Sequence, residues 1–233
     1  QRMGLGFLEP WPLWNAALRR ESRSGFFAVV AAILIFTMTP IYLITNHLMD
    51  WRDTTVWDPS TSLDTSIPFI AWSMIFYQSL FFLFYPLPFY TMPDTTEARR
   101  ETLIASQGLL TLTVVSNLIF VLLPCEIFIR EQAVAGVAGA NPLLVSAFEF
   151  QWWIDSPYNA WPSLHISTSG MFTLFTLRWW KGQPVKQWII GILWLLMALS
   201  ILTTKQHFVW DLVTALALLG AVWHWQMRPA LSG

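Results

Sequence analysis

The sequence contains few charged side chains and a single cysteine. Only 12% of its residues are charged, against 55% that are hydrophobic, a balance outside the usual range of soluble domains. The formal net charge of -1 offers neither a basic surface for nucleic acid nor an acidic tail. Cys125 has no partner for a disulfide within the chain. The composition therefore predicts an integral membrane protein whose main partner is the lipid bilayer, with no nucleic-acid partner.

Long apolar stretches dominate what is present. An α-helix needs about 20 residues to cross the hydrocarbon core of a bilayer. Prolines at Pro40, Pro86 and Pro88 predict kinks or helix ends. We expect an all-α fold with a single membrane domain over residues 1–233, made of an N-terminal cytoplasmic segment (1–25) and a six-transmembrane-helix bundle (26–228). The expected spans are residues 26–49, 67–90, 103–129, 163–180, 185–203 and 207–226.

The positive charges predict the orientation, because cytoplasmic loops retain lysine and arginine. Arg52, Arg130 and Lys205 fall on one side of the expected bundle. Both termini are therefore predicted to be cytoplasmic, and the loops at 50–66 and 130–162 are predicted to lie on the other face. The remaining ten of the thirteen cations fall on the cytoplasmic side: Arg2, Arg19, Arg20, Arg23, Arg99, Arg100, Arg178, Lys181, Lys186 and Arg228.

His207 and Asp211 are the most informative pair of residues in the chain. They are four residues apart, so on a helix their side chains lie on one face, one turn from each other. A carboxylate one turn inside a membrane helix is costly unless it is paired. Asp211 can accept a hydrogen bond from one ring nitrogen of His207, which leaves the other nitrogen as a nucleophile or base. The alternative is a structural pair that locks two helices together.

A second polar group runs from the expected external loop into the fourth span. Pro162 suits a first helical turn, where its missing N–H costs nothing. The free amides of that turn and the positive end of the helix dipole favour an anion such as phosphate. His165 would stand beside that anion, although a lone histidine at a helix start is more often a capping or interfacial side chain.

Arg130 and Lys205 are candidate phosphate ligands on the same face. Both sit at expected helix ends that can border one cavity. Arginine offers a planar fork of donors and lysine a mobile point charge, so together they can neutralise a phosphoryl group. The alternative is that their side chains only reach toward the interface, as many cations at helix ends do.

The order of these elements resembles a known family. Pro-Ser-Leu-His at 162–165, followed by Ser200, Lys-Gln-His-Phe at 205–208 and Asp211, on six expected helices, resembles the phosphatidic acid phosphatase type 2 superfamily. The two tetrapeptide forms are most similar to the inositol phosphorylceramide synthase-like branch, and more distantly to the sphingomyelin synthases. The motifs are concentrated between about residue 120 and residue 215, and the first two spans match only in general hydropathy.

The resemblance implies a reaction and a role for each matching residue. The histidine that matches His207 attacks phosphorus and becomes a phosphohistidine, the aspartate that matches Asp211 orients it, and the histidine that matches His165 protonates the leaving group. The implied protein is a membrane lipid phosphatase or phosphotransferase that acts on a lipid phosphate or diphosphate, without cofactor or metal. The placement of the positive charges predicts a site on the non-cytoplasmic face, which fits a bacterial inner membrane or the lumenal face of a eukaryotic organelle membrane.

Two elements of the family pattern are missing. The serine-arginine pair shortly before the nucleophilic histidine reads Ser200-Ile201 here, and the early lysine followed by Arg-Pro is absent. We therefore assign phosphate binding to other side chains and substrate contacts to the loop before the fourth span. The phosphate candidates are Arg130, Lys205, Ser163 and Ser200, and the substrate candidates are Asp155, Tyr158 and Asn159.

Two other classes of protein remain as alternatives. His165, His207 and Asp211 can be three ligands of a catalytic zinc ion with an open position, which would make the protein a metal-dependent intramembrane hydrolase. A transporter can instead use the buried Asp211 and the histidines to relay protons or substrate. A transporter predicts polar residues through the full depth of the helices, whereas we expect the polar residues here to cluster at one face, and no inverted repeat is visible.

Overall fold

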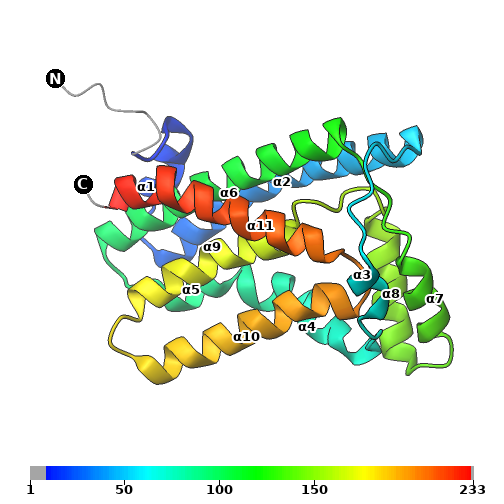
Figure 1. Cartoon of the computed structure of the whole chain (residues 1–233). Coiled ribbons are helices and arrows are strands. Elements are labelled where there is room, and N and C mark those ends of the chain that lie inside the picture. Colours follow the sequence, from blue (N-terminus) through cyan, green and yellow to red (C-terminus); the bar gives the residue numbers. More distant parts are fainter. Residues whose placement is uncertain (1–8, 232–233) are drawn as a thin grey trace.

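The computed structural model describes residues 9–231, which form helices and connecting loops with no β-strand. Arg2 and the first part of the expected segment 1–25 lie outside the described residues. Five long helices lie roughly side by side (Figure 1): α2 (Arg23–Arg52), α6 (Thr96–Leu122), α9 (Leu164–Trp179), α10 (Pro184–Thr203) and α11 (Val209–Val222). The all-α prediction is thus confirmed for the described chain.

The shorter helices complete the bundle and its ends. The chain enters the bundle through η1 (Pro12–Trp14) and α1 (Asn15–Leu18), and leaves it through η4 (Trp223–Met227) and α12 (Arg228–Leu231). The others, in chain order, are α3 (Ser62–Ser66), η2 (Ala71–Ser73), α4 (Met74–Ser79), η3 (Leu80–Phe84), α5 (Leu87–Thr91), α7 (Arg130–Val137) and α8 (Pro142–Ile154).

Three helices, α2, α6 and α10, are long and apolar enough to cross a membrane. The segment Ala71–Phe84 is a shorter apolar helix. Each of the other expected spans also coincides with helical chain, but the number of six crossings stays a prediction. The membrane character of the protein is supported by these three helices.

Side-chain caps and a left-handed residue set the ends of two long helices. Ser22 Oγ accepts a hydrogen bond from the Gly25 amide at the start of α2, and Thr95 Oγ1 accepts one from the Ala98 amide at the start of α6, both at 3.1 Å. The α2 helix continues through Pro40 and ends at Asp53, which adopts the left-handed conformation with φ 44°.

Prolines make two stretches differ from the expected spans. Residues 67–90 are not one helix: η2, α4, η3 and α5 follow one another, and Pro86 caps α5. The expected span 103–129 is also wrong at its end, because α6 stops at Leu122. The next residue, Leu123, precedes Pro124 and has φ −134° and ψ 59°, since a residue before proline is kept out of the α region.

The two expected external loops contain helices that gather at one end of the bundle. Helices α3, α7 and α8 lie together at one end, whereas α1 and the end of the chain lie at the other (Figure 1). At that second end Arg99 Nη1 donates to Arg20 O at 2.7 Å and Arg100 Nη1 donates to Ala230 O at 3.2 Å. The basic residues near the two ends of the chain therefore share one end of the bundle, while their cytoplasmic orientation stays a prediction.

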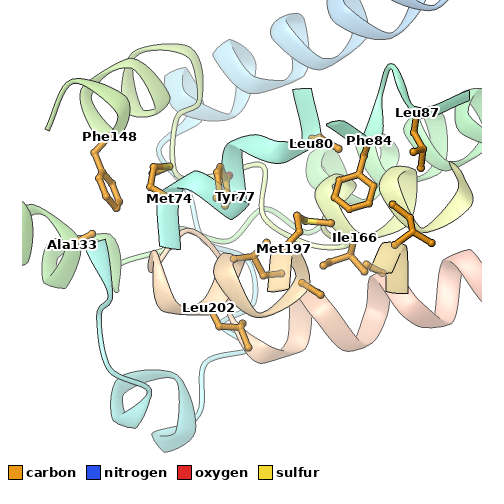
Figure 2. Packing of buried hydrophobic residues seen from close by; sticks show 14 of the residues in the cluster. Met74, Tyr77, Leu80, Phe84, Leu87, Ala133, Phe148, Ile166, Met197 and Leu202 are labelled. Carbon is orange, nitrogen blue, oxygen red and sulfur yellow. The ribbon is translucent and has the colours of Figure 1, made fainter. Parts of the chain in front are cut away.

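The core joins the elements that carry the two candidate histidines. Figure 2 shows side chains from α4 and η3, among them Met74 and Phe84, packed against Ile166 of α9 and Met197 of α10. A Cβ atom on Gly170 would lie 2.5 Å from Leu219 Cδ2, so Leu219 packs directly over the glycine where α9 and α11 meet. This close packing holds the helix that follows His207 beside the helix that contains His165.

Buried polar side chains extend along the helices, which corrects one expectation. Small hydroxyl residues lie buried deep in α6 and α9, for example Ser106, Ser116, Ser169 and Thr173. Ser106 Oγ donates to the Thr102 carbonyl of its own helix at 2.9 Å, so its hydroxyl is satisfied without a partner on another helix. Neutral polar residues are therefore not confined to the end of the bundle that carries His165 and His207.

Candidate functional site

The His207 ring is held by two hydrogen-bond acceptors at one nitrogen. His207 Nδ1 lies 3.0 Å from Asp211 Oδ2 and 3.1 Å from the carbonyl oxygen of Ala160. Because an acceptor cannot donate, Nδ1 must carry the proton, and in the neutral ring Nε2 keeps its lone pair. The same Asp211 oxygen accepts the Phe208 amide at 2.9 Å, which fixes the carboxylate at the start of α11.

The free nitrogen of His207 faces the beginning of α9. Nε2 lies 3.4 Å from Ser163 Oγ, and Ser163 is the N-cap residue of α9. The Ser163 amide donates to the backbone oxygen of Asp211 at 3.2 Å, so the starts of α9 and α11 are joined directly. Ser163 Oγ accepts no hydrogen bond from the first turn of α9, which leaves the amides of that turn available to an anion.

The His165 ring lies across from the His207 ring. The ring centroids are 5.8 Å apart and the ring planes meet at 63°. Tyr77 of α4 lies against His165 with a centroid distance of 4.1 Å and an interplanar angle of 32°. Among the described residues, no side chain or backbone group makes a hydrogen bond with the buried His165 Nε2. A phosphoryl group between the two rings can therefore lie about 3 Å from a nitrogen of His165 and a nitrogen of His207 at the same time.

An amphipathic cavity of about 340 Å³ opens beside the two histidines. Leu43 and Phe81 are partly exposed on the outer surface of the bundle, with 38% and 46% of their surface accessible. The cavity thus combines a polar end with walls that reach the lipid-facing surface. Its polar lining includes His165, His207, Asp155, Asn159, Gln151 and Tyr42, and its apolar lining includes Met38, Leu43, Leu80, Phe81 and Leu164.

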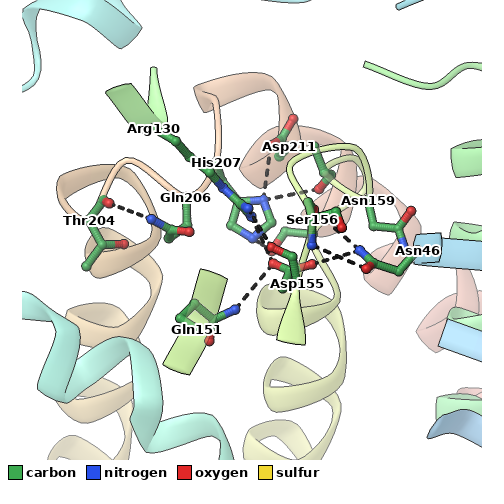
Figure 3. Close-up of polar contacts among 12 residues, drawn as sticks. Asn46, Arg130, Gln151, Asp155, Ser156, Asn159, Thr204, Gln206, His207 and Asp211 are labelled. Carbon is green, nitrogen blue, oxygen red and sulfur yellow. Dashed lines mark hydrogen bonds and ion pairs between the residues drawn. The ribbon is translucent and has the colours of Figure 1, made fainter. Parts of the chain in front are cut away.

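Asp155 is the centre of a polar network at the wall of this cavity (Figure 3). Its Oδ2 accepts Arg130 Nη2 at 2.9 Å and Gln151 Nε2 at 3.3 Å. Its Oδ1 accepts Asn46 Nδ2 at 3.2 Å (Figure 3). The same oxygen accepts the Tyr42 hydroxyl. These donors come from α2, α7 and α8, so one carboxylate ties the hairpin of α7 and α8 to the bundle.

Arg130, expected to bind phosphate, is engaged by Asp155 in this structure. Besides the ion pair, Arg130 Nη1 donates to the backbone oxygen of Asp155 at 2.6 Å. Arg130 and Asp155 also line a second, open cavity of about 610 Å³, together with His47 and Asp50. Asp155 therefore lies between the two cavities, whereas Arg130 borders only the second.

Lys205 and Ser200 do not line the cavity of the two histidines. Lys205 is completely buried, and its Nζ donates to the backbone oxygens of Asp64, at 2.7 Å, and Ile67. Burial lowers the pKa of Lys205, and the Asp64 carboxylate opposes this shift. Ser200 Oγ donates to the Met197 carbonyl of its own helix at 2.6 Å. The expected phosphate-binding roles of both residues lack structural support.

Two of the three expected substrate residues line the histidine cavity, and the third does not. Asn159 lines the histidine cavity, and its Nδ2 donates to the Tyr42 carbonyl at 3.5 Å. Tyr158 instead donates its hydroxyl to Asp53 Oδ1 beyond the end of α2, and burial together with this bond raises its pKa. The structure therefore brings Asp155 and Asn159 to the cavity, but not Tyr158.

Four side chains at this site are absent from the sequence-based prediction of site residues. Tyr42 and Asn46 are four residues apart in an apolar stretch, and such a polar pair on one helix face was a usable signal. Gln151 and Tyr77 had no comparable signal, because their partners lie far away in the chain.

The zinc alternative requires several ligand side chains that point to one common position. Within residues 9–231, no group of three or more His, Cys, Asp or Glu side chains is arranged to hold a metal ion. The His207 nitrogen nearest Asp211 is already hydrogen-bonded to that carboxylate. A zinc site would therefore require these side chains to rearrange.

Comparison with known proteins identifies the family. A family model described as the PAP2 superfamily matches residues 47–225, a range that contains His165, His207 and Asp211. Searches of curated proteins and of solved structures gave no match. The match does not reach the level of a branch, so the similarity to inositol phosphorylceramide synthases stays an expectation. Because the match covers well over half of the sequence, the chain belongs to the PAP2 superfamily.

Proposed function

We propose that the protein is a membrane lipid phosphatase or phosphotransferase that works through a covalent phosphohistidine on His207. Membership of the PAP2 superfamily supports phosphatase or phosphotransferase chemistry. The observation that carries the proposal is the held tautomer of His207: Nδ1 contacts Asp211 and Ala160, while Nε2 faces Ser163 with His165 opposite.

In the first step the lone pair of His207 Nε2 attacks phosphorus. The nitrogen–phosphorus bond forms as the phosphorus–oxygen bond to the leaving group breaks, and a protonated His165 gives its proton to the departing oxygen. His207 becomes positively charged, and the Asp211 carboxylate 3.0 Å from Nδ1 stabilises that charge. The free amides at the start of α9 are suited to bind the phosphoryl oxygens.

In the second step the neutral His165 accepts a proton from the incoming hydroxyl. The resulting oxygen attacks phosphorus, the nitrogen–phosphorus bond breaks, and His207 returns to its neutral form. Water as acceptor makes the protein a phosphatase, and a lipid hydroxyl makes it a phosphotransferase. Splitting one displacement into two lets the same pair of histidines serve both halves of the reaction.

The substrate that fits the cavity is an amphiphile with a phosphorylated headgroup. Its apolar chain would lie along Met38, Leu43 and Leu80, while its phosphate would lie at His165 and His207. The starts of α9 and α11 flank the candidate site, and both helices run from there toward the basic ends of the chain (Figure 1). We therefore place it on the non-cytoplasmic face, following the preference of basic residues for the cytoplasm.

The test offers purified protein a panel of lipid phosphates and diphosphates. We expect phosphate release or a new phospholipid with the wild type, and a loss of at least about 1,000-fold with His207→Ala. His224→Ala is the matched control, because His224 lies in η4 near the other end of the bundle. A radiolabelled phosphoprotein that is acid-labile and disappears in His207→Ala would identify the intermediate. Activity that survives His207→Ala contradicts the proposal.

Chelation and vanadate separate this mechanism from the zinc alternative. A phosphohistidine enzyme should keep its activity in a metal chelator and lose it to vanadate, which mimics the phosphoryl transition state. A zinc hydrolase should lose activity in the chelator and regain it on addition of zinc.

A further inference from the structure

The short helix α3 and the residue after it contact the chain on both sides of His207. Two residues before the histidine, Lys205 Nζ donates to the backbone oxygens of Asp64 and Ile67. Two residues after it, the Val209 amide donates to Asp64 Oδ1 at 2.6 Å. Both contacts come from α3 and the residue that follows it.

Asp64 is itself rigidly held. Its second oxygen, Oδ2, accepts the Thr61 amide and the Thr61 hydroxyl, each at 2.7 Å, in a capping box at the start of α3. The side chain is therefore fixed with Oδ1 directed to Val209, and only 2% of the residue is exposed. The carboxylate thus satisfies one of the free amides at the start of α11.

Lys205 is held in an unusual backbone conformation. Its φ is 60°, which lies in the left-handed region that non-glycine residues rarely adopt. Such a conformation persists where the surroundings impose it, and here the ammonium is anchored at the carboxyl end of α3, where a cation is favoured. The chain reverses at Lys205 just before it reaches His207.

Further contacts join the segment around α3 to the turn that contains His207. The Ile70 amide donates to the Thr203 carbonyl at 2.9 Å, and the Ser73 and Thr203 hydroxyls lie 2.7 Å apart. On the other side, the Trp57 and Trp210 rings pack edge to face with centroids 5.3 Å apart. Residues 57–73 therefore contact the turn at residues 203–210, which contains His207, along its whole length.

We propose that residues 61–67 form a clamp that positions His207, with Asp64 and Lys205 as its two positioning residues. Neither residue lines the histidine cavity, so both act through the backbone of residues 205–209. The clamp fixes the distance between His207 Nε2 and Ser163, and with it the line of attack on phosphorus. This catalytic part of the inference rests on the proposed function.

The test compares Asp64→Ala and Lys205→Met with the wild type and with Asp58→Ala. Asp58 is the matched control, since it is an exposed carboxylate of the same loop whose Oδ1 accepts only the nearby Ser60 amide at 2.8 Å. We expect kcat to fall about 10- to 100-fold in the two clamp variants, because a small misplacement of a reacting group has effects of that order. KM should stay within about twofold, as expected when substrate binding is intact.

Two further readouts separate positioning from a general structural effect. Lys205→Arg keeps a cation with several donors and should restore most of the kcat that Lys205→Met loses. Hydrogen–deuterium exchange should become faster in residues 203–211 and 61–67 of the clamp variants, while exchange in α6 stays as in the wild type.

Several outcomes would overturn the clamp. An increase in KM with unchanged kcat in Lys205→Met would mean that Lys205 binds the phosphate group directly. Unchanged exchange at residues 203–211 in Asp64→Ala would mean that α3 does not hold the turn. If Asp64→Ala fails to fold, Asp64→Asn decides, because it keeps the shape but its amide nitrogen cannot accept a hydrogen bond, so either the Val209 amide or Thr61 loses its acceptor. Unchanged kcat and unchanged exchange there would also overturn the proposal.

The exchange measurement keeps this inference distinct from the proposed function. If the wild type forms no phosphoprotein and releases no phosphate, the phosphohistidine mechanism fails. The exchange of residues 203–211 in Asp64→Ala still tests the clamp in that case, because it depends on no substrate.

Discussion

The phenol ring of Tyr77 lies against the imidazole of His165, with centroids 4.1 Å apart and planes at 32°. Tyr77 belongs to α4 and is completely buried, so it limits the orientations that His165 can adopt. Within the described chain, no group makes a hydrogen bond with its buried hydroxyl. The ring of Tyr77, more than its hydroxyl, therefore orients the proposed proton donor.

Tyr77→Leu should lower kcat by about 10- to 100-fold, because a general acid that is no longer oriented loses part of its 10²- to 10⁴-fold contribution. Tyr77→Phe keeps the ring and should retain kcat within about threefold. It should also leave thermal stability unchanged or slightly higher, since it removes a hydroxyl that lacks a partner. Equal losses of kcat in both variants would show that the hydroxyl acts in the reaction.

Asp211→Asn should reduce phosphoprotein formation by about 10²- to 10³-fold, because asparagine has no negative charge to stabilise the positive charge that His207 gains when Nε2 attacks phosphorus. The measurement is the single-turnover rate of labelling with a radioactive lipid phosphate. Asp58→Asn is the control and should label at the wild-type rate. A normal rate in Asp211→Asn would show that Asp211 is only structural.

Removing one partner of the Arg130–Asp155 pair should destabilise the protein by about 3–5 kcal/mol, because the other charge is left buried and unpaired. The pair is 2.9 Å apart and both side chains are about one-tenth exposed. Arg130→Met with Asp155→Asn should cost less than the sum of the two single changes, as measured by thermal unfolding in detergent. Additive losses would indicate that the two residues act independently.

Leu43→Trp should raise KM for lipid phosphates with long chains by about tenfold and leave short-chain analogues nearly unaffected, because it fills the apolar part of the cavity. Leu48→Trp is the matched control: it has a similar exposure, 39% against 38%, and does not line the cavity. Equal kinetics of the two variants would place the lipid chain elsewhere.

The Cys125 thiol should react very slowly with maleimide in the folded protein. Burial, with smaller contributions from the carboxylates of Asp211, Asp58 and Glu126, raises its pKa to about 12. At pH 8 the reactive thiolate would then be roughly one part in 10⁴, and its fraction should rise with pH up to that pKa.

Gln132→Cys supplies the control for this labelling experiment, since Gln132 is an exposed residue of α7. Native Gln132→Cys should take up one label, and the unfolded variant should take up two, as measured by intact mass. Rapid native labelling of the parent protein would contradict the buried environment of Cys125.

The sequence by itself determined the features that depend on local spacing. Hydrophobic runs indicated the helices because burial in lipid is decided residue by residue along a segment. The four-residue interval of His207 and Asp211 placed both side chains on one face, and their hydrogen bond follows from helix geometry. Pro124 was also visible, and its effect on Leu123 could have predicted the early end of α6.

Only the tertiary structure decided which distant groups meet. The sequence predicts Lys205 as a phosphate ligand, yet its ammonium donates to the backbone oxygen of Asp64, 141 residues earlier in the chain. Tyr77 likewise reaches His165 only because α4 and α9 both pack against α10. Such contacts depend on how whole helices pack, and a local pattern carries no information on which of several polar groups a buried cation or ring will face.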